Sequence, residues 1–276
     1  MPPSPVAVEA ALDGADVVVV DNLFSLPLNE AATAVVAGVL AGRPAVVRHH
    51  DLPWQRPRAT RGWGRVPDDP RWAHVTINSR SRRELAARQG LRAFTLPNRF
   101  PLDGWLAPQA HGGRVVLHPV RAIARKDVPA ALALAEAVGA IYWLTGDAED
   151  GYGPELERVL AGARTGVRRE ATPSSADAYA ACDAVVFPST VEGFGNPVIE
   201  SALARRPLAV RRYPVLVDDL EPLGFRWFAH DDGPGLARYL DDPDPALLDD
   251  NEALAREHFG LDRLPQELSA VLERVL

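Results

Sequence analysis

Short apolar runs alternate with helical segments along most of this 276-residue chain, and this alternation constrains its fold more than any other feature. Residues 185–187 (Val-Val-Phe) are typical of the apolar runs, because a short β-branched stretch without a polar face suits a strand covered on both sides. Strands that alternate with helices build parallel sheets with helices on both faces. The sequence therefore predicts an α/β fold whose ligands bind beyond the carboxyl ends of the strands.

The pattern predicts an element at most of these positions. We expect strands over residues 16–20, 44–47, 74–78, 93–96, 114–117, 140–144, 166–168, 185–187, 208–211 and 225–228. We expect helices over residues 30–41, 82–89, 128–138, 154–160, 176–182, 197–205, 235–240, 250–258 and 264–276. Asn29, Ser81 and Asp127 are the expected N-caps, because their side chains can accept hydrogen bonds from the first amides of a helix.

Two stretches without periodicity divide the chain. Residues 101–113 are rich in Gly and Pro, which makes them the best candidate for a linker. We therefore expect one Rossmann-like domain over residues 1–104, a second over 105–260, and a terminal helix over 261–276 that packs back toward the first. Residues 52–72 predict a long surface loop, whose Trp54 and Trp63 either line a ligand groove or anchor the loop.

The stretch from Asp183 to Arg205 combines a strand, a glycine-rich turn and a helix. Gly193 and Gly195 allow a ligand to approach the backbone, and Asn196 is the expected N-cap, with Pro197 as the first helical residue. A helix N-terminus attracts phosphate, whereas the flanking carboxylates of Glu192 and Glu200 suit hydroxyl groups. A nucleotide sugar satisfies both demands. The alternative is an ordinary strand-to-helix turn with two solvated glutamates.

The charged residues narrow the choice of partners. Of the 30 basic residues, Lys126 is the single lysine, and a compact ammonium is not interchangeable with the guanidinium of the other 29 in a tight site. The net charge is −7, and we expect no nucleic-acid polymer as a partner. Residues 56–99, however, hold eleven Arg against three carboxylates, which could meet a membrane surface or an anionic acceptor. A solvated face or a contact with the acidic second half of the chain explains this surplus equally well.

Nothing in the sequence resembles a membrane span or a signal peptide, since the apolar runs are short and the first ten residues lack basic and apolar regions. The single cysteine, Cys182, excludes an internal disulfide and suits a small buried residue. We therefore expect a cytoplasmic protein.

The second half resembles the nucleotide-sugar-binding domain of retaining glycosyltransferases of the GT-B fold, of the family 4 type. Residues 192–200 (EGFGNPVIE) are similar to that family's Glu-x7-Glu signature. Arg121 and Lys126 resemble its paired cations, residues 145–147 (TGD) its second-strand turn, and residues 183–189 its strand that leads to Pro-Ser. The resemblance covers residues 114 to about 230, with the motifs in the expected order. It implies a hexosyl transfer from a UDP- or GDP-sugar to an unidentified acceptor.

The resemblance also implies roles for individual residues. Arg121, Lys126 and the helix start at Asn196 would neutralise the leaving diphosphate, so we expect neither a metal ion nor a cofactor. Glu200 would hold the ribose hydroxyls, and Glu192 would lie near the transferred sugar.

The turn and the neighbouring strand end would contribute backbone contacts. Pro197 has no N–H, so the amides of Phe194, Gly195 and Asn196 would have to bind the donor, with Gly193 and Gly146 leaving room for it. The alternative for Arg121 and Lys126 is an ordinary surface pair on a loop.

The first half resembles only the later part of the family's acceptor domain. His50–Asp51 is similar to the family's His-Asp pair, and Pro97–Asn98 to the residues that close that domain. His50 would therefore lie near the sugar or the acceptor, and the alternative is a structural histidine bonded to a neighbouring loop. The glycine-rich first portion of the family has no counterpart before Asp16, so we expect a truncated first domain.

Two other functions stay open at this point. The chain could be a non-catalytic nucleotide-sugar-binding module, or a partner subunit of a complete transferase, because of the short first domain. A third, weaker reading is an epimerase or a phosphorylase on the same fold.

Overall fold

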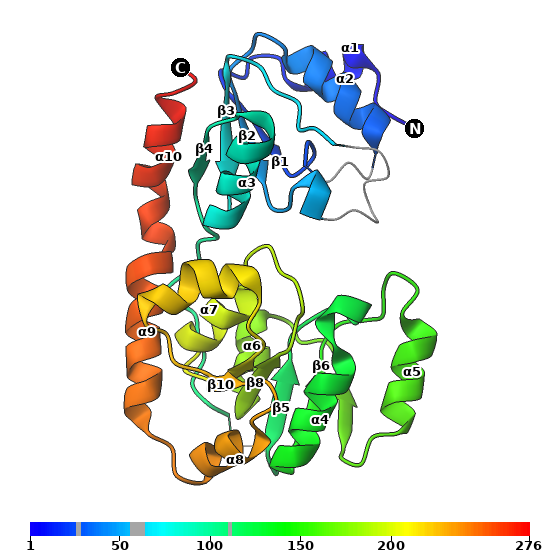
Figure 1. The fold of residues 1–276 in the computed structure, drawn as a ribbon, viewed down its shortest axis with the longest axis vertical. Coiled ribbons are helices and arrows are strands. Elements are labelled where there is room, and N and C mark those ends of the chain that lie inside the picture. The colour runs from blue at the N-terminus through cyan, green and yellow to red at the C-terminus, as the bar shows by residue number, and fades with distance from the viewer. Residues whose placement is uncertain (26–28, 56–63, 110–111) are drawn as a thin grey trace. The chain divides into compact units, whose positions relative to one another are not determined.

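A computed structural model of the protein describes residues 1–25, 29–55, 64–109 and 112–276. It forms two compact units, Met1–Asn98 with Asp262–Leu276, and Arg99–Leu261. Each unit is a parallel α/β sheet with helices, as the alternation predicts (Figure 1). No helix among the described residues has the length and apolar character needed to cross a membrane.

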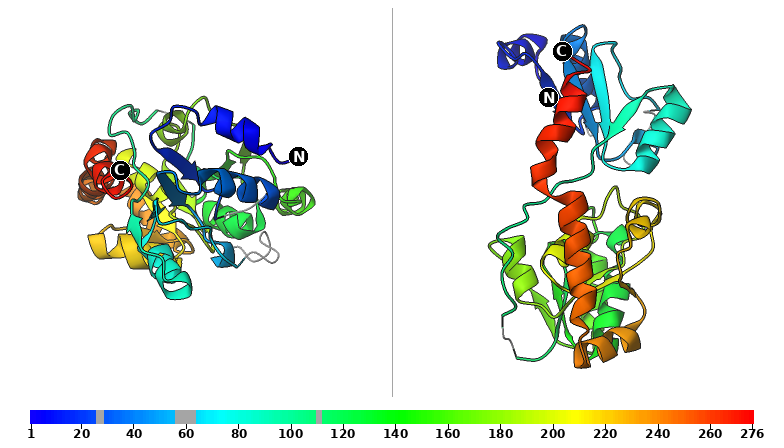
Figure 2. Two further views of the ribbon diagram at one scale, coloured as in Figure 1. Left: turned by 90° about the horizontal axis from the view of Figure 1, so that it is seen from above. Right: turned by 90° about the vertical axis from the view of Figure 1, so that its left-hand side faces the viewer.

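The first unit contains a parallel sheet of four strands in the described residues, in the order β1-β2-β3-β4. Its strands and helices are α1 (Pro5–Ala11), β1 (Val18–Asp21), α2 (Glu30–Leu40), β2 (Ala45–His49), η1 (Pro53–Gln55), β3 (Trp72–Thr76), α3 (Ser79–Gln89), β4 (Ala93–Thr95) and α10 (Leu264–Leu272). Helix α1 packs beside α2. The C-terminal segment, red in Figure 2, lies along the sheet of this unit, and its Val271 and Val275 pack into the core with residues of β2 and β3.

The second unit contains a parallel sheet of six strands in the described residues, in the order β10-β9-β8-β5-β6-β7. Its elements are β5 (Val115–His118), η2 (Ala124–Lys126), α4 (Val128–Val138), β6 (Ile141–Leu144), α5 (Gly153–Ala161), β7 (Val167–Arg169), α6 (Ser175–Ala180), β8 (Ala184–Phe187), α7 (Asn196–Leu203), β9 (Leu208–Val210), η3 (Leu216–Leu220), η4 (Glu221–Leu223), β10 (Phe228–Ala229), α8 (Gly233–Asp241) and α9 (Pro245–Phe259). The short turn η5 (Leu261–Arg263) follows α9.

This strand order identifies where the second sheet can bind a ligand. The chain runs outward from β5 to β6 and β7, then returns to the other side of β5 and runs outward again through β8, β9 and β10. Such an order has a topological switch point between β5 and β8, where loops leave the sheet in opposite directions and open a crevice. Strands β5 and β8 pair in parallel, with Leu117 opposite Val185.

The structure corrects the expected ends of a helix and a strand, and it adds a helix that the sequence analysis missed. Asn78, not Ser81, caps α3, and its Oδ1 accepts from the Ser81 amide at 2.6 Å. The strand expected over 225–228 is a two-residue strand, Phe228–Ala229, which pairs with Ala209 and Val210 of β9. Helix α1 was not anticipated from the Pro-rich start, although Ser4 caps it.

The stretch 101–113 is not a free linker. Within its described residues, the Trp105 ring packs edge-on against Tyr179 at 5.7 Å and the Gln109 amide donates to the Ala180 carbonyl, so the segment belongs to the second unit. The chain instead passes from the first unit to the second at residues 98–99.

Candidate functional site

A buried ion pair lies at the switch point of the second sheet. Lys126, at the end of the turn that follows β5, has its Nζ 2.5 Å from Oε1 of Glu192, in the loop that follows β8. Both side chains are about nine-tenths buried, and the Lys126 ammonium also lies over the Phe187 ring at 4.9 Å. The two strands bring these residues together across 66 positions of sequence.

Burial and charge oppose each other in this pair. Burial lowers the pKa of the Lys126 ammonium, and the attraction of Glu192 only partly restores it. Burial also disfavours the ionised Glu192, but Lys126 and Arg125 outweigh this effect and hold the pKa of that carboxyl below its ordinary value. The pair therefore consists of two opposite charges in a largely buried site, where electrostatic interactions are stronger than in water.

The second cation on Glu192 is Arg125, which the sequence analysis did not single out. Its Nη1 donates to Glu192 Oε1 at 2.8 Å and to the Val191 carbonyl. Arg121, which the sequence analysis predicts as the second cation beside Lys126, is exposed and pairs with Glu149 at 2.6 Å. Arg121 is near enough to Lys126 to contribute to the lowering of its pKa. Arg125 directly precedes the single lysine, and this position could have identified it as a candidate residue of the site.

The glycine turn precedes α7 with a left-handed residue at its cap. Gly195, not Asn196, is the N-cap, with φ at 99°, and Asn196 is the first helical residue. A Cβ at Gly195 would lie 2.0 Å from the Tyr213 hydroxyl, which itself donates to the Phe194 carbonyl at 2.8 Å. This position therefore requires glycine both for its backbone conformation and for the close approach of Tyr213.

The turn before α7 offers backbone amides to a ligand, whereas the Phe194 ring is not available. That ring is buried against Phe100 and Phe259. Within the described parts of the chain, the amides of Phe194 and Gly195 have no hydrogen-bond acceptor. Free amides at the start of a helix are suited to an anion.

The second glutamate of the motif lies one turn into α7. Tyr179 donates to Glu200 Oε2 at 2.8 Å, and burial raises the pKa of the Glu200 carboxyl. Oε1 has no partner within the described residues, so it can accept from a ligand. Tyr179, on α6, is thus a supporting residue that the sequence offered no signal for.

Gly146 follows β6 at a point where two loops meet. A Cβ there would lie 2.4 Å from the Val120 carbonyl oxygen and 2.8 Å from the Arg121 Cα. The Ala122 amide donates to the Asp147 carbonyl at 2.9 Å, which holds the two loops together. Gly146 therefore sets the position of the loop that carries Arg121 and Lys126.

His50 belongs to the first unit, where it follows β2. Its Nε2 lies 2.8 Å from Asp21 Oδ1 and 2.7 Å from Arg48 Nη1, and its amide donates to Asn22 Oδ1. These contacts match a histidine bonded to a neighbouring loop, and its predicted contact with sugar or acceptor stays a prediction. No group of three or more His, Cys, Asp or Glu is placed to hold a metal ion in the described residues.

The two tryptophans of the long loop differ in what can be said of them. Trp54 donates to Glu84 Oε2 at 2.8 Å and lies under Arg88, so it anchors the loop to α3. Trp63 and the first residues of the Arg-rich stretch, from Arg56, lie outside the described residues. Cys182 is buried, as predicted.

No known protein-family model matches the chain. Two curated proteins named mannosylglucosylglycerate synthase are similar to it in sequence. The protein from Petrotoga mobilis is 25% identical over 270 residues, which cover 76% of this chain and 62% of that protein. The protein from Thermotoga maritima is 23% identical, over 94% of this chain and 76% of that protein. The chain thus spans less than two thirds of the length of the Petrotoga protein.

Solved structures resemble this one over nearly its whole length. Anabaena HepE in complex with UDP-glucose superposes with a TM-score of 0.76 at 18% identity, over 98% of this chain and 81% of HepE. A glycosyltransferase from Rickettsia africae gives a TM-score of 0.72 at 12% identity, over 98% of this chain and 80% of that one. The pneumococcal O-GlcNAc transferase GtfA in complex with UDP and GlcNAc gives a TM-score of 0.66 at 14% identity, over 98% of this chain and 59% of GtfA. The chain therefore has the α/β fold of GT-B glycosyltransferases, with two parallel-sheet domains.

Proposed function

We propose that this protein is a retaining glycosyltransferase, which moves a hexosyl group from a nucleotide-diphosphate sugar to an acceptor without a bound metal ion. The buried Lys126–Glu192 pair at the switch point between β5 and β8 carries the proposal. Similarity to proteins named mannosylglucosylglycerate synthase supports transfer, and the likeness to HepE in complex with UDP-glucose supports a nucleotide-sugar donor.

The cations of the site would bind the donor diphosphate. When the bond between the sugar and the phosphate breaks, negative charge develops on the leaving nucleotide diphosphate. Lys126 and Arg121 would neutralise it, and Arg125, which already contacts Glu192, would add a third positive charge. This arrangement supplies the charge that a metal ion otherwise provides.

The turn before α7 would complete the diphosphate site. The amides of Phe194 and Gly195 would donate to phosphate oxygens at the positive end of the helix dipole. Asn196 and Gly193 would contribute from the same turn, and Gly146 from the neighbouring strand end.

The two glutamates would bind hydroxyl groups of the donor. Glu200 offers Oε1 to the ribose while Tyr179 holds Oε2, so the carboxylate enters the site already oriented. Glu192, held by Lys126 and Arg125, would lie near the transferred sugar. The new bond would form on the face from which the diphosphate leaves, and we assign no protein nucleophile.

The acceptor side rests on predictions from the sequence. His50 is the predicted contact with the sugar or the acceptor, and Asp21 and Arg48 hold its ring in place. The Arg-rich residues 56–99 are the predicted contact with a membrane surface or an anionic acceptor.

Calorimetric titration with UDP-glucose and GDP-mannose, paired with an assay for donor hydrolysis and transfer, tests this proposal. We expect one donor to bind and turn over, and Glu200→Gln to weaken its binding at least tenfold because a ribose acceptor is lost. Glu155→Gln is the matched control, since Glu155 pairs with Arg158 on the surface of α5. Donor binding without any turnover would instead indicate a non-catalytic module, and no binding of either donor would contradict both functions.

A further inference from the structure

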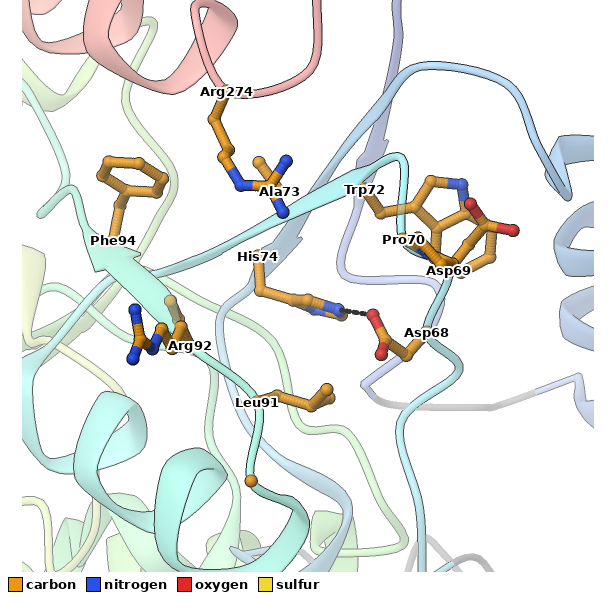
Figure 3. Close-up of a pocket in the computed structure, with 12 residues that line it drawn as sticks. Asp68, Asp69, Pro70, Trp72, Ala73, His74, Leu91, Arg92, Phe94 and Arg274 are labelled. Carbon is orange, nitrogen blue, oxygen red and sulfur yellow. Dashed lines mark hydrogen bonds and ion pairs between the residues drawn. The ribbon is translucent and has the colours of Figure 1, made fainter.

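The first unit contains a pocket that the proposed function does not use. It has a volume of about 540 Å³ and lies where β3 and β4 begin (Figure 3). The residues that matter for the argument are Asp68, Trp72, His74, Arg92, Phe94 and Arg274. Arg274 comes from the C-terminal segment, which Val271 and Val275 anchor in the core of the same unit.

The pocket is separate from the residues predicted to bind sugar or acceptor. Trp72 is the first residue of β3, and Arg92 directly precedes β4, so the pocket opens at the amino ends of the strands. His50 follows the last residue of β2 and lies at the carboxyl ends. The pocket and His50 therefore lie at opposite ends of the strands of one parallel sheet.

Two guanidinium groups line the pocket without a partner. Arg92 and Arg274 make no hydrogen bond or ion pair within the described residues. Elsewhere in this unit, Arg48 and Arg80 are paired with carboxylates. The pocket also holds two carboxylates, Asp68 and Asp69, but neither pairs with these arginines, because both oxygens of Asp69 accept from the backbone amides of Gly42 and Arg71. The two guanidinium groups are therefore available to the anionic group of a ligand.

Asp68 provides the pocket with a fixed hydrogen-bond acceptor. Asp68 Oδ1 lies 3.0 Å from Nε2 of His74, whose side chain is only 3% exposed. The other ring nitrogen of His74 lies 2.9 Å from His49 Nε2, and His49 Nδ1 lies 2.5 Å from the Ser25 hydroxyl. Burial and the neighbouring His74 lower the pKa of His49 to about 3. Burial also lowers the pKa of His74 below its ordinary value, although Asp68 opposes this effect, so both rings are neutral at pH 7.

Neutral rings give this chain of hydrogen bonds one direction. Ser25 donates to His49, His49 donates to His74, and His74 donates to the Asp68 carboxylate. Asp68 is thereby held in place, while its Oδ2 has no partner within the described residues. A carboxylate oxygen that is fixed and accessible accepts a hydrogen bond from a hydroxyl group of a ligand.

The remaining lining is aromatic. Trp72 is buried with its indole N–H bonded to the Leu40 carbonyl, and Phe94 is half-buried opposite it in the pocket (Figure 3). Aromatic walls suit the carbon skeleton of a ligand and not a bare inorganic ion.

We propose that this pocket binds a small hydroxylated organic anion. Arg92 and Arg274 hold its phosphate or carboxylate group, a hydroxyl group donates to Asp68, and the carbon skeleton lies on Phe94. This ligand is not the nucleotide-sugar donor, whose proposed site is in the second unit.

Titrations with glycerol 3-phosphate, glycerate, inorganic phosphate and glycerol, followed by calorimetry and thermal shift, test this proposal. We expect glycerol 3-phosphate or glycerate to bind at least tenfold more tightly than inorganic phosphate or glycerol. The tighter of the two distinguishes a phosphate from a carboxylate ligand, and both results support the site. Binding of neither organic anion, or equal affinity for inorganic phosphate, would overturn it.

Variants locate the binding in the pocket. Arg92→Ala and Arg274→Ala should each weaken binding about tenfold or more, since each removes a charge-assisted hydrogen bond. Asp68→Asn should weaken the binding of the organic anion but not the binding of inorganic phosphate. Arg82→Ala is the matched control, because Arg82 is an exposed residue of α3 that does not line the pocket. Equal losses in this control would overturn the assignment, and melting temperatures without ligand would show that each variant is folded.

Discussion

Replacement of Lys126 by methionine separates the charge of this residue from its packing. Methionine is unbranched and polarizable, so it fills nearly the same space as the lysine stem. The change leaves Glu192, whose side chain is 9% exposed, with Arg125 as its remaining cation at 2.8 Å. Breaking a buried pair costs about 3–5 kcal/mol, and because Arg125 stays in place we expect the lower end, about 3 kcal/mol.

This loss can be measured as a melting temperature. For domains of this size, 1 kcal/mol corresponds to roughly 2–4 °C, so Lys126→Met should melt about 6–12 °C below the wild type. Addition of Glu192→Gln should recover part of the loss, because the carboxylate left without its lysine is then neutral. Arg226→Met is the control, since Arg226 pairs with Asp250 on the surface and its loss should change the melting temperature little.

Activity provides an independent measure of the same change. Loss of one group that stabilises developing charge costs on the order of 10²–10³ in kcat. The Lys126→Met, Glu192→Gln double variant should therefore be more stable than Lys126→Met and still inactive. A Lys126→Met protein that melts with the wild type and transfers sugar at a similar rate would refute the assignment of this pair to the donor site.

Three further predictions concern the same unit. Gly195→Ala should destabilise the protein by about 2 kcal/mol or more in thermal melts, because φ is 99° and the new Cβ would overlap the Tyr213 hydroxyl. Burial and nearby Lys126 lower the pKa of His118 to about 3, so the unfolded chain binds a proton at this residue below pH 6.5 while the folded one does not. The free energy of unfolding should therefore fall by about 2–3 kcal/mol between pH 7 and pH 4.5, and His118→Phe should remove that part of the slope in denaturant melts across this range. Excess chelator should leave sugar transfer unchanged, and lost activity that a divalent cation restores would contradict metal independence.

Much of the candidate site was predicted from the sequence. Lys126, Glu192 and Glu200 stood out because a single lysine, a glycine-rich turn and a marked helix start are local features. The α/β class followed from apolar periodicity, which depends only on nearby residues. Gly195 was also anticipated as a backbone requirement, although its role as N-cap was assigned one residue too late.

The tertiary structure decided which charges meet. Arg125, and not Arg121, shares Glu192 with Lys126, because the loop after β5 turns Arg121 outward to Glu149. Several arginines could have formed that contact, and sequence distance does not choose between them.

Local sequence thus determined most of the elements of this protein and most of the side chains that we propose bind a nucleotide sugar. It could not determine that β8 returns to pair with β5, which brings Lys126 and Glu192 together across 66 positions. Local sequence also could not predict that Asp68, Arg92 and Arg274 line one pocket. Periodicity and capping act within a few residues along the chain, whereas these contacts depend on strand order and on packing between elements that are distant in sequence.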